Sequence, residues 1–510
     1  MSGSIGELAA IFRGGAVVLL GNVIGRGFNF FAHILIANAL LPKLMGRVGI
    51  AFTVVSTLGT ISLVGIPKAI PRRMSEADRD QRDILFGGYI IALSLGSISS
   101  ALVYHFSDEI AIAIQSPEIA PILKPFSAFI FLYSLSKTAI SGLRGRELSS
   151  ETVIIRDVLG PILPVGIFIF LSTIGYPVIG AILYFLSIHA IVASIGTYRL
   201  ISGLEVSLHT IRVNIPEMKD LLSFSWPLAL STNLILLMNN FDLLMIGYFL
   251  SSESAGYYKT IQPLGMLVLL PLTSFTFLYL PIVTRYFEKG DIDFLDQVFT
   301  ATTKWISLIA FPIVLVLILF PESVIRLFFR PEYIPAATAL GVYALGMFSR
   351  VFVGPNGAMI KAINQTRVDL ISAVIGAMTN IVLNIVLIPR FGIEGAALAT
   401  GLGFLMYNIT EVSVVYYHMG IHPFALNSVK PLLVTVIVAI SIQRYLMPAE
   451  VGFAGLFLFG VGITAFELFS LVATRSLDES DYQLGLRVCQ RIGVDPGNLP
   501  RVLKPNEREK

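Results

Sequence analysis

The sequence predicts an all-α polytopic membrane protein, with about 14 transmembrane helices arranged as two six-helix bundles and an extra C-terminal helix pair. Of the 510 residues, 55% are hydrophobic and only 14% are charged, whereas a soluble domain usually carries about 25% charged residues. The mean hydropathy is +0.79. The apolar residues also gather in segments of the length that spans a bilayer as a helix, which is roughly 20 residues.

The predicted elements begin with an interfacial amphipathic helix at residues 1–13, because Ile5, Leu8 and Phe12 share one helical face. The apolar segments follow in order, and each is long enough to span. Their approximate limits are Gly14–Leu40, Leu44–Ile66, Ile84–Phe106, Ala120–Ser141, Val153–Thr173, Val178–Leu200, Leu221–Leu250, Ala255–Val283, Thr300–Phe320, Pro335–Ile360, Arg367–Ile388, Ile393–Tyr417, Val429–Met447 and Gly452–Thr474.

The spans divide into two halves with a weak internal repeat. Ile36–Gly46 reads IANALLPKLMG and Ile246–Gly256 reads IGYFLSSESAG, and each ends a long span with a short turn and a glycine that opens the next helix. Duplicated bundles commonly place a substrate path between the halves and work by rocking. The predicted domains are an N-terminal bundle at 14–200, a cytoplasmic linker at 201–220, a C-terminal bundle at 221–418, the extra pair at 429–474 and a cytoplasmic tail at 475–510.

The loop charges predict the orientation in the membrane. The loop Pro67–Asp83 is rich in basic residues, whereas the next loop, Ser107–Ile119, contains neither Lys nor Arg. Because cytoplasmic loops carry an excess of Lys and Arg, both termini are predicted to be cytoplasmic. We expect a multi-pass protein of the plasma membrane. The basic residues of the first loop are Lys68, Arg72, Arg73, Arg79 and Arg82.

The first span carries a polar stripe. Asn22, Arg26, Asn29 and His33 follow at spacings of four, three and four residues, which places them on one face of a helix. An arginine that faces lipid near the bilayer centre costs roughly 3 kcal/mol or more. Arg26 is therefore expected either to pair with a carboxylate, for which Asp242 is the candidate, or to line a path for an anionic substrate.

Other spans carry charged and polar residues that could share such a path. With Arg26, the basic set predicted to bind substrate is Lys137, Lys259 and Arg350, and the acids Asp242 and Glu411 are candidates for ion coupling. A net positive path would stabilise a phosphate or pyrophosphate head group. Taken singly, each asparagine is more often an interhelical hydrogen-bonding residue. The predicted polar lining consists of Asn22, Asn29, His33, Asn239, Asn240, Asn380 and Asn384.

Signals for catalysis and cofactors are poor. The single cysteine, Cys489, excludes an intramolecular disulfide. The six histidines are scattered along the chain, which argues against a metal site. The pair Asp291 and Asp293 has the spacing of a metal-binding motif, but it lies in a charged loop and is more typical of a solvated surface. No Walker-type loop occurs. We expect no enzyme activity, no cofactor and no nucleic-acid partner.

Several short motifs in the sequence resemble those of a known protein family. The run Leu387–Thr400, LIPRFGIEGAALAT, preceded by Asn380 and Asn384, resembles a signature of polysaccharide-biosynthesis flippases in the multidrug/oligosaccharidyl-lipid/polysaccharide exporter superfamily. Ser141–Gly145 (SGLRG) and Arg13–Gly15 (RGG) look like the first half of that family. The resemblance covers essentially the full chain. It implies two six-helix bundles around a central cavity and a cationic residue for the lipid phosphate, a pattern that Arg26 matches.

The resemblance also implies a function. We expect a flippase that moves a polyprenyl-phosphate- or pyrophosphate-linked oligosaccharide, a polysaccharide or N-glycan precursor, from the cytoplasmic to the outer leaflet by alternating access. Its partners would be the lipid-linked glycan and membrane lipids, with glycan polymerases or transferases as candidate protein partners. Two alternatives stay open. An ion-coupled multidrug exporter of the same superfamily would line its cavity with carboxylates, and a membrane-embedded glycan polymerase or ligase would need larger external loops.

Overall fold

The computed structural model of the protein describes residues 21, 24–76, 78–203, 214–424, 426–448, 450–477 and 481. Several predictions lie outside these residues: the amphipathic helix at 1–13, the Arg13–Gly15 motif, Asn22, half of the linker and most of the tail. Within the described ranges every regular element is a helix, which confirms the predicted all-α class. The described chain separates into two compact units, Met1–Thr260 with Ile388–Ile393 (unit 1) and Ile261–Leu387 with Glu394–Lys510 (unit 2).

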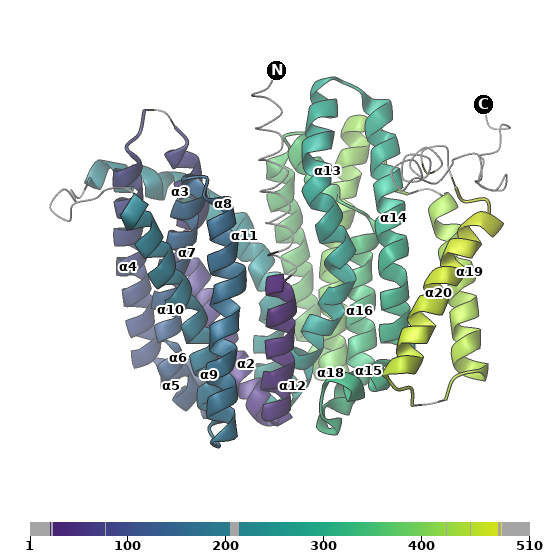
Figure 1. Ribbon diagram of the computed structural model, residues 1–510, viewed down its shortest axis with the longest axis horizontal. Coiled ribbons are helices and arrows are strands. Elements are labelled where there is room, and N and C mark those ends of the chain that lie inside the picture. Colours follow the sequence, from purple (N-terminus) through teal and green to yellow (C-terminus); the bar gives the residue numbers. More distant parts are fainter. Residues whose placement is uncertain are drawn as a thin grey trace. The chain divides into compact units, whose positions relative to one another are not determined.

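The helices of each unit follow one another along the chain (Figure 1). Those of unit 1 are residues 24–39, α2 (Pro42–Ser62), α3 (Ile66–Met74), α4 (Gln81–His105), α5 (Ser107–Ala113), η1 (Pro117–Ile119), α6 (Ala120–Phe126), α7 (Ala128–Gly145), α8 (Ser149–Val153), η2 (Ile154–Leu159), α9 (Gly160–Thr173), α10 (Pro177–Gly203), α11 (Ile215–Phe249) and the first part of α12 (Ser252–Met266). Those that follow in unit 2 are η4 (Leu267–Leu269), α13 (Leu270–Glu288), α14 (Ile292–Leu319), α15 (Pro321–Phe328), η5 (Pro331–Ala336), α16 (Ala337–Phe352), α17 (Asn356–Ala362), α18 (Thr366–Met419), α19 (Leu426–Tyr445) and α20 (Phe453–Ala473).

These helices confirm a polytopic membrane protein. Among the described residues, nine helices are long and apolar enough to cross a membrane, or up to eleven if each of two bent pairs forms one span. One of the nine, α18, contains two of the predicted spans. Its backbone leaves the helical region at Gly392, so α18 consists of two helices joined at that residue. Asn380 donates a hydrogen bond to Thr400 at 3.4 Å, and Tyr407 donates one to Asp369 at 2.7 Å. The two parts of α18 therefore run antiparallel, side by side.

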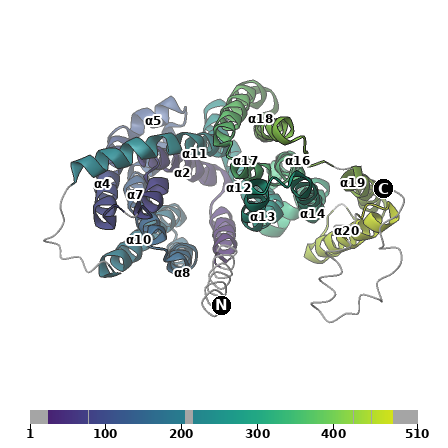
Figure 2. The ribbon, with the colours of Figure 1, turned by 90° about the horizontal axis from the view of Figure 1, so that it is seen from above.

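Unit 1 is organised around α7, which packs against α2, α3, α4 and α10. Figure 2 shows α7 between α4 and α10. Side chains that are at most 2% exposed fill the interface, among them Ile70 on α3, Leu143 on α7, Leu200 on α10 and Leu221 on α11. Burying such side chains contributes about 1.5 to 3 kcal/mol each in water, and inside a bilayer the gain comes instead from close packing.

The division between the units differs from the expected boundary at the 201–220 linker. Helix α11, which we assigned to the second bundle, packs against α2, α3 and α4 and so belongs to unit 1 by contact. Close backbone approach explains part of this. A Cβ on Gly65, whose φ of 80° also suits glycine, would overlap the carbonyl oxygen of Ser225 on α11. Contacts describe packing and not the bodies that move, so the two six-helix bundles stay a prediction.

Helices α2 and α12 meet at a pair of glycines. A Cβ on Gly46 would overlap the carbonyl oxygen of Ser252, and a Cβ on Gly256 would overlap the carbonyl oxygen of Pro42. Each glycine thus opens the space for the other helix, as small residues do at interfaces between membrane helices. These two glycines close the two repeated segments, Ile36–Gly46 and Ile246–Gly256.

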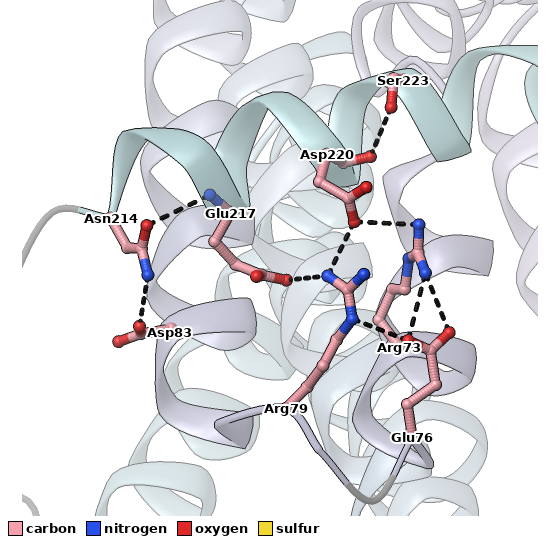
Figure 3. Close-up of polar contacts among 8 residues, drawn as sticks. All are labelled: Arg73, Glu76, Arg79, Asp83, Asn214, Glu217, Asp220 and Ser223. Carbon is pink, nitrogen blue, oxygen red and sulfur yellow. Dashed lines mark hydrogen bonds and ion pairs between the residues drawn. The ribbon is translucent and has the colours of Figure 1, made fainter.

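The start of α11 is held to the α3–α4 segment by an ion cluster, drawn in Figure 3. We define the ion cluster as Arg73, Glu76, Arg79, Glu217 and Asp220. Arg79 contacts all three of the acids at 2.7 Å, and Arg73 contacts Asp220 at 2.9 Å. The hydrogen bond to Glu217 is the chief reason why the pKa of Arg79 rises above its usual value. The guanidinium therefore stays charged at every physiological pH.

A cap continues the same attachment. The side chain of Asn214 accepts a hydrogen bond from the backbone N–H of Glu217 at 3.2 Å, and it donates one to Asp83 at 2.7 Å (Figure 3). Asparagine is among the preferred residues for the first position before a helix, because its side chain satisfies a backbone donor that the helix leaves open. Asn214 therefore begins α11 and ties that beginning to α4.

Unit 2 is organised around α14, which packs against α13, α16, α19 and α20. Its core includes Phe299 and Met359, both 0% exposed. Helices α19 and α20 form a hairpin beside α14 (Figure 1). The buried ammonium of Lys304 on α14 pairs with Asp481, and Trp305 donates a hydrogen bond to the same carboxylate at 2.8 Å. The chain that follows the extra pair is thus fixed to α14.

Candidate functional site

The predicted basic set divides between the units. Arg26, Lys137 and Lys259 belong to unit 1, and Arg350 belongs to unit 2. A charge that faces hydrocarbon is costly, and the cost falls when the side chain finds polar, aromatic or hydrated surroundings. The neighbours of each cation therefore indicate whether its charge is already neutralised or could bind an anionic ligand.

Lys259, on α12, lies along α2. A Cβ on Gly49 would come within 3.2 Å of Lys259 Cγ, so this glycine leaves room for the lysine stem. One turn further along α2, the Lys259 ammonium stands over the ring of Phe52, 5.7 Å from its centroid. His33 of the first helix lies within electrostatic reach of Lys259 and near the backbone of Thr260. Two predicted site residues, Lys259 and His33, are thus neighbours.

Lys137 lies at the middle of α7, where its ammonium stands 5.0 Å from the centroid of the Tyr133 ring. The two residues are four apart on one helix, so their side chains share a face. The Tyr133 hydroxyl hydrogen-bonds Thr60 of α2 at 3.2 Å, and a Cβ on Gly59 would touch the same ring at 3.3 Å. Helix α2 therefore holds Tyr133 in place beneath the Lys137 ammonium.

Both lysines stand on one ring cluster, which we define as Phe52, Phe126, Phe129, Tyr133, Phe185 and His189. Phe52 lies 4.3 Å from Phe185 and 5.4 Å from Phe129, measured between ring centroids. Phe129 continues to Tyr133 at 5.3 Å, and His189 lies 4.8 Å from Phe129. Such separations are those of favourable aromatic pairs. The cluster joins α2, α6, α7 and α10. The Lys259 ammonium stands over its Phe52 ring, and the Lys137 ammonium stands over its Tyr133 ring.

The rings form an inner and an outer layer. Phe126 and Phe129 are at most 1% exposed, whereas Phe52, Tyr133, Phe185 and His189 are partly exposed. Ser136 hydrogen-bonds the Nδ1 atom of His189 at 2.8 Å. The outer layer therefore brings partly exposed rings, two ammonium groups and a few hydroxyls into one part of unit 1. This surface suits a ligand with an anionic group next to an apolar or mixed face.

Arg26 and Asn29 are exposed side chains of the first helix. Asn29 donates a hydrogen bond to the Gly25 carbonyl at 2.8 Å and accepts one from Tyr184 at 3.4 Å. Gly25 packs closely on η2, because a Cβ there would lie 2.8 Å from Asp157 Cβ. Asp157 accepts two hydrogen bonds from Arg156, at 2.8 and 2.7 Å. Arg26 therefore comes directly after the residue at which the first helix packs against Asp157, and Asp157 is already paired with Arg156.

The other predicted residues of unit 1 are Asn239, Asn240 and Asp242 on α11. Asp242 is 0% exposed and accepts a hydrogen bond from Tyr258 at 2.9 Å. Asn240 is partly buried, and the side chain of Asn239 lies outside the described ones. Tyr258 immediately precedes Lys259 on α12. The residue that bonds Asp242 is therefore the chain neighbour of Lys259.

In unit 2, Arg350 stands over the ring of Phe404, 4.0 Å from its centroid. Glu411 is 0% exposed and faces Gly357, where a Cβ would lie 3.5 Å from a carboxylate oxygen. Arg350 lies within electrostatic reach of that carboxylate. The side chains of Tyr407 and Asp369 also lie within reach of Glu411. The backbone breaks at Gly354, with φ of 66°, between α16 and α17.

The remaining asparagines, Asn380 and Asn384, are at most 1% exposed and lie on the first part of α18. A Cβ on Gly403 would come within 2.9 Å of the Asn380 Cβ. Together with the Asn380–Thr400 hydrogen bond, this contact places Asn380 between the two antiparallel parts of α18. It fits the interhelical hydrogen-bonding role that single asparagines most often play in membranes.

Comparison with known proteins then decides the family. The family described as polysaccharide biosynthesis protein matches residues 35–338, which is more than half of the chain. The chain belongs to this polysaccharide biosynthesis family.

Two curated relatives are similar to this chain. This member of the polysaccharide biosynthesis family is 22% identical over 400 residues to the probable low-salt glycan biosynthesis flippase Agl15 of Haloferax volcanii, an alignment that covers 78% of this chain and 82% of the relative. It is 25% identical over 181 residues to the uncharacterized membrane protein MJ1068 of Methanocaldococcus jannaschii. The chain spans only 35% of the length of that second relative.

Solved structures show that the polysaccharide biosynthesis family member has a transporter fold. An inward closed form of the lipid II flippase MurJ aligns with a TM-score of 0.66 at 18% identity, covering 89% of this chain and 98% of that one. An inward-facing multidrug resistance transporter of the MATE family aligns with a TM-score of 0.65 at 17% identity, covering 79% and 98%. At these identities the likeness concerns the fold alone.

Sequence reasoning selected the charged residues and missed the rings beneath them. A signal was present: Phe129, Tyr133 and Lys137 follow at intervals of four on α7, and Phe185 and His189 do so on α10. That signal resembles ordinary core packing, since only the fold brings α2 next to these helices. The approach of Arg156 and Asp157 to the first helix was also missed, and Gly21 and Gly25, four residues apart, were its signal.

Proposed function

We propose that the protein is a flippase that carries a polyprenyl-phosphate- or pyrophosphate-linked oligosaccharide from the cytoplasmic to the outer leaflet. The observation that supports this proposal is that Lys137 and Lys259 stand over two partly exposed rings of one ring cluster in unit 1, on helices that belong to the two bent candidate spans. An anionic head group would find two cationic donors there. Family membership and the names of the relatives agree with this substrate class.

The mechanism follows from where the charges lie. With both termini in the cytoplasm, Arg26 would meet the phosphate first, and Lys137 and Lys259 would hold it deeper in unit 1. The isoprenoid tail can remain in lipid, since only the sugar and phosphate need polar surroundings. Alternating access would then expose the head group on the other side. The residues act by binding alone, so no bond is made or broken and the protein would not be an enzyme.

Unit 2 offers a candidate for ion coupling. Glu411 is a buried carboxylate in reach of Tyr407 and of a second carboxylate, that of Asp369, besides Arg350. A buried carboxylate in that setting favours binding a proton or a monovalent cation. Asp242, the second predicted coupling acid, already accepts a hydrogen bond from Tyr258. We therefore favour Glu411 over Asp242 for this role.

The test is leaflet translocation of a fluorescent polyprenyl-phosphate-linked sugar in proteoliposomes. Wild type should move the lipid, Arg26→Ala should slow it at least about tenfold and Arg26→Lys should keep part of the rate, because the charge remains. A wild type that is inert towards such lipids, yet moves an organic cation along an ion gradient, would overturn the proposal in favour of a multidrug exporter. Transfer of the glycan to an acceptor by the purified protein would favour a polymerase or ligase.

A further inference from the structure

The ring cluster offers more than support for two cations. The outer rings Phe52 and Tyr133 each have an ammonium group over one face, at 5.7 and 5.0 Å from the centroids. Behind them lie the buried rings of the inner layer, Phe126 and Phe129. A purely structural cluster needs no charge above it. The lysines therefore mark the faces of Phe52 and Tyr133 as surfaces that meet something other than lipid.

The ammonium groups can leave these faces when a better partner arrives. A cation over a ring is stabilised by about 0.5 to 1 kcal/mol at exposed sites. A charge-assisted hydrogen bond to phosphate is stronger, and a lysine side chain is long and flexible enough to turn towards it. Binding of a phosphate beside Lys137 or Lys259 would consequently draw the ammonium from the ring and uncover the ring face.

We propose that the uncovered faces of Phe52 and Tyr133 bind the pyranose ring of the sugar attached to the phosphate. This inference rests on the proposed function and names the part of the substrate that the rings recognise. One face of many pyranoses presents a row of C–H groups, which pack on an aromatic ring as other apolar groups do. Because the first sugar is bonded directly to the phosphate, a lysine that holds the phosphate places that sugar at the ring.

Polar groups at the edge of the rings complete the match. Thr60 hydrogen-bonds the Tyr133 hydroxyl at 3.2 Å, and Ser136 hydrogen-bonds His189 at 2.8 Å. Sugar hydroxyls can replace or extend such bonds at little cost, since each hydroxyl both donates and accepts. An organic cation is a poor fit for the same faces, because two ammonium groups already occupy them and repel a further positive charge.

The test compares two ligands on the same protein: a short-chain polyprenyl phosphate and the same lipid bearing one hexose. Equilibrium binding to detergent-solubilised full-length protein gives the ratio of the two Kd values. In Phe52→Leu and Tyr133→Leu the preference for the hexose-bearing lipid should fall by about threefold to tenfold. Tyr133→Phe, which keeps the ring face, should retain most of the preference. Phe348→Leu, at a ring pair with Phe311 in unit 2, serves as the matched control and should leave the ratio unchanged.

The outcomes separate this inference from the proposed function. A ratio that stays at the wild-type value in both leucine variants would overturn the sugar-binding role, and so would an equal loss for both lipids. Because the ratio is measured on one preparation, partial misfolding changes both affinities together and cannot imitate the expected result. If wild type binds neither lipid, the proposed function falls as well.

Discussion

Two groups of cations in unit 1 have opposite surroundings. In the ion cluster, Arg79 contacts three carboxylates, and Arg73 contacts two of the same acids and the ring of Phe224. In the ring cluster, Lys137 stands over Tyr133 and has no ion pair with any described residue. Charges that are neutralised by neighbours fix helices to one another, whereas a cation held only by a ring keeps its charge available for a ligand. The difference separates a structural arginine from a candidate binding lysine.

The largest effect is expected at the lysines. Lys137→Ala and Lys259→Ala should each lower flipping of the sugar-bearing lipid by about tenfold or more, because each removes a charge-assisted hydrogen bond to phosphate. Lys→Arg variants should keep part of the rate. The initial rate in proteoliposomes measures this effect.

Lys124→Ala is the matched control for the lysine variants. The Lys124 ammonium pairs with exposed Asp108 at 2.9 Å. Its loss should change the rate less than twofold, since exposed ion pairs contribute about 0 to 1 kcal/mol. A loss as large as that of Lys137→Ala would mean that any lysine of unit 1 matters, and the comparison would fail.

A smaller effect, on stability and not on transport, is expected at Arg79. Arg79→Ala leaves Glu76, Glu217 and Asp220 facing one another and should lower the free energy of unfolding by about 1 to 2 kcal/mol. Thermal denaturation at about 0.1 and 1 M salt measures the change, which should shrink at high salt. Arg72→Ala, an exposed position on the neighbouring helix α3, should have no measurable effect. Equal destabilisation by the two variants would contradict a specific role for Arg79.

The pH dependence of that contribution has a definite sign. The pKa of Arg79 is raised above its usual value of 12.5, so the arginine stabilises the fold at every pH below that value. The contribution of its positive charge should therefore be constant through the neutral range. A fall in the Arg79→Ala effect between about pH 6 and 9 would mean that another group, and not this arginine, controls the cluster.

The smallest effect is expected at the cap of α11. Asn214→Ala removes the acceptor for the Glu217 N–H and should cost about 1 kcal/mol. Asn214→Asp keeps an acceptor but places a second carboxylate against Asp83, so its stability should lie between the alanine variant and wild type. Thermal denaturation ranks the three proteins. An aspartate variant more stable than wild type would show that the contact with Asp83 does not matter.

Much of the fold could be predicted because bilayer thickness fixes the length of a spanning helix. The segments Arg367–Ile388 and Ile393–Tyr417 meet at the break that the backbone makes at Gly392. Other boundaries were less exact. The span that we ended at Ile66 bends at Gly65 and then continues as α3 to Met74, because apolar length marks the bilayer and not the end of a helix.

The site could be predicted only where one helix carries the signal. Lys137 and Lys259 stand out in the sequence because charges are rare within apolar segments. The rings around the lysines do not stand out in this way. Phe52 comes from α2 and Phe185 from α10, and the sequence near either residue does not predict their contact. The partners of Arg79 include Glu217, which is 138 residues away in the chain. Long-range pairing of this kind depends on the packed fold.

The glycine contact between α2 and α12 has a consequence for the history of the chain. In a symmetric dimer, equivalent residues of the two copies meet at the twofold axis. Gly46 and Gly256, which close equivalent segments of the two halves, meet in this way inside one polypeptide. An ancestral half-length protein that paired with its own copy would have made the same contact between two chains. A side chain at either glycine would overlap the backbone of the facing helix, so neither position can be substituted unless the two helices move apart.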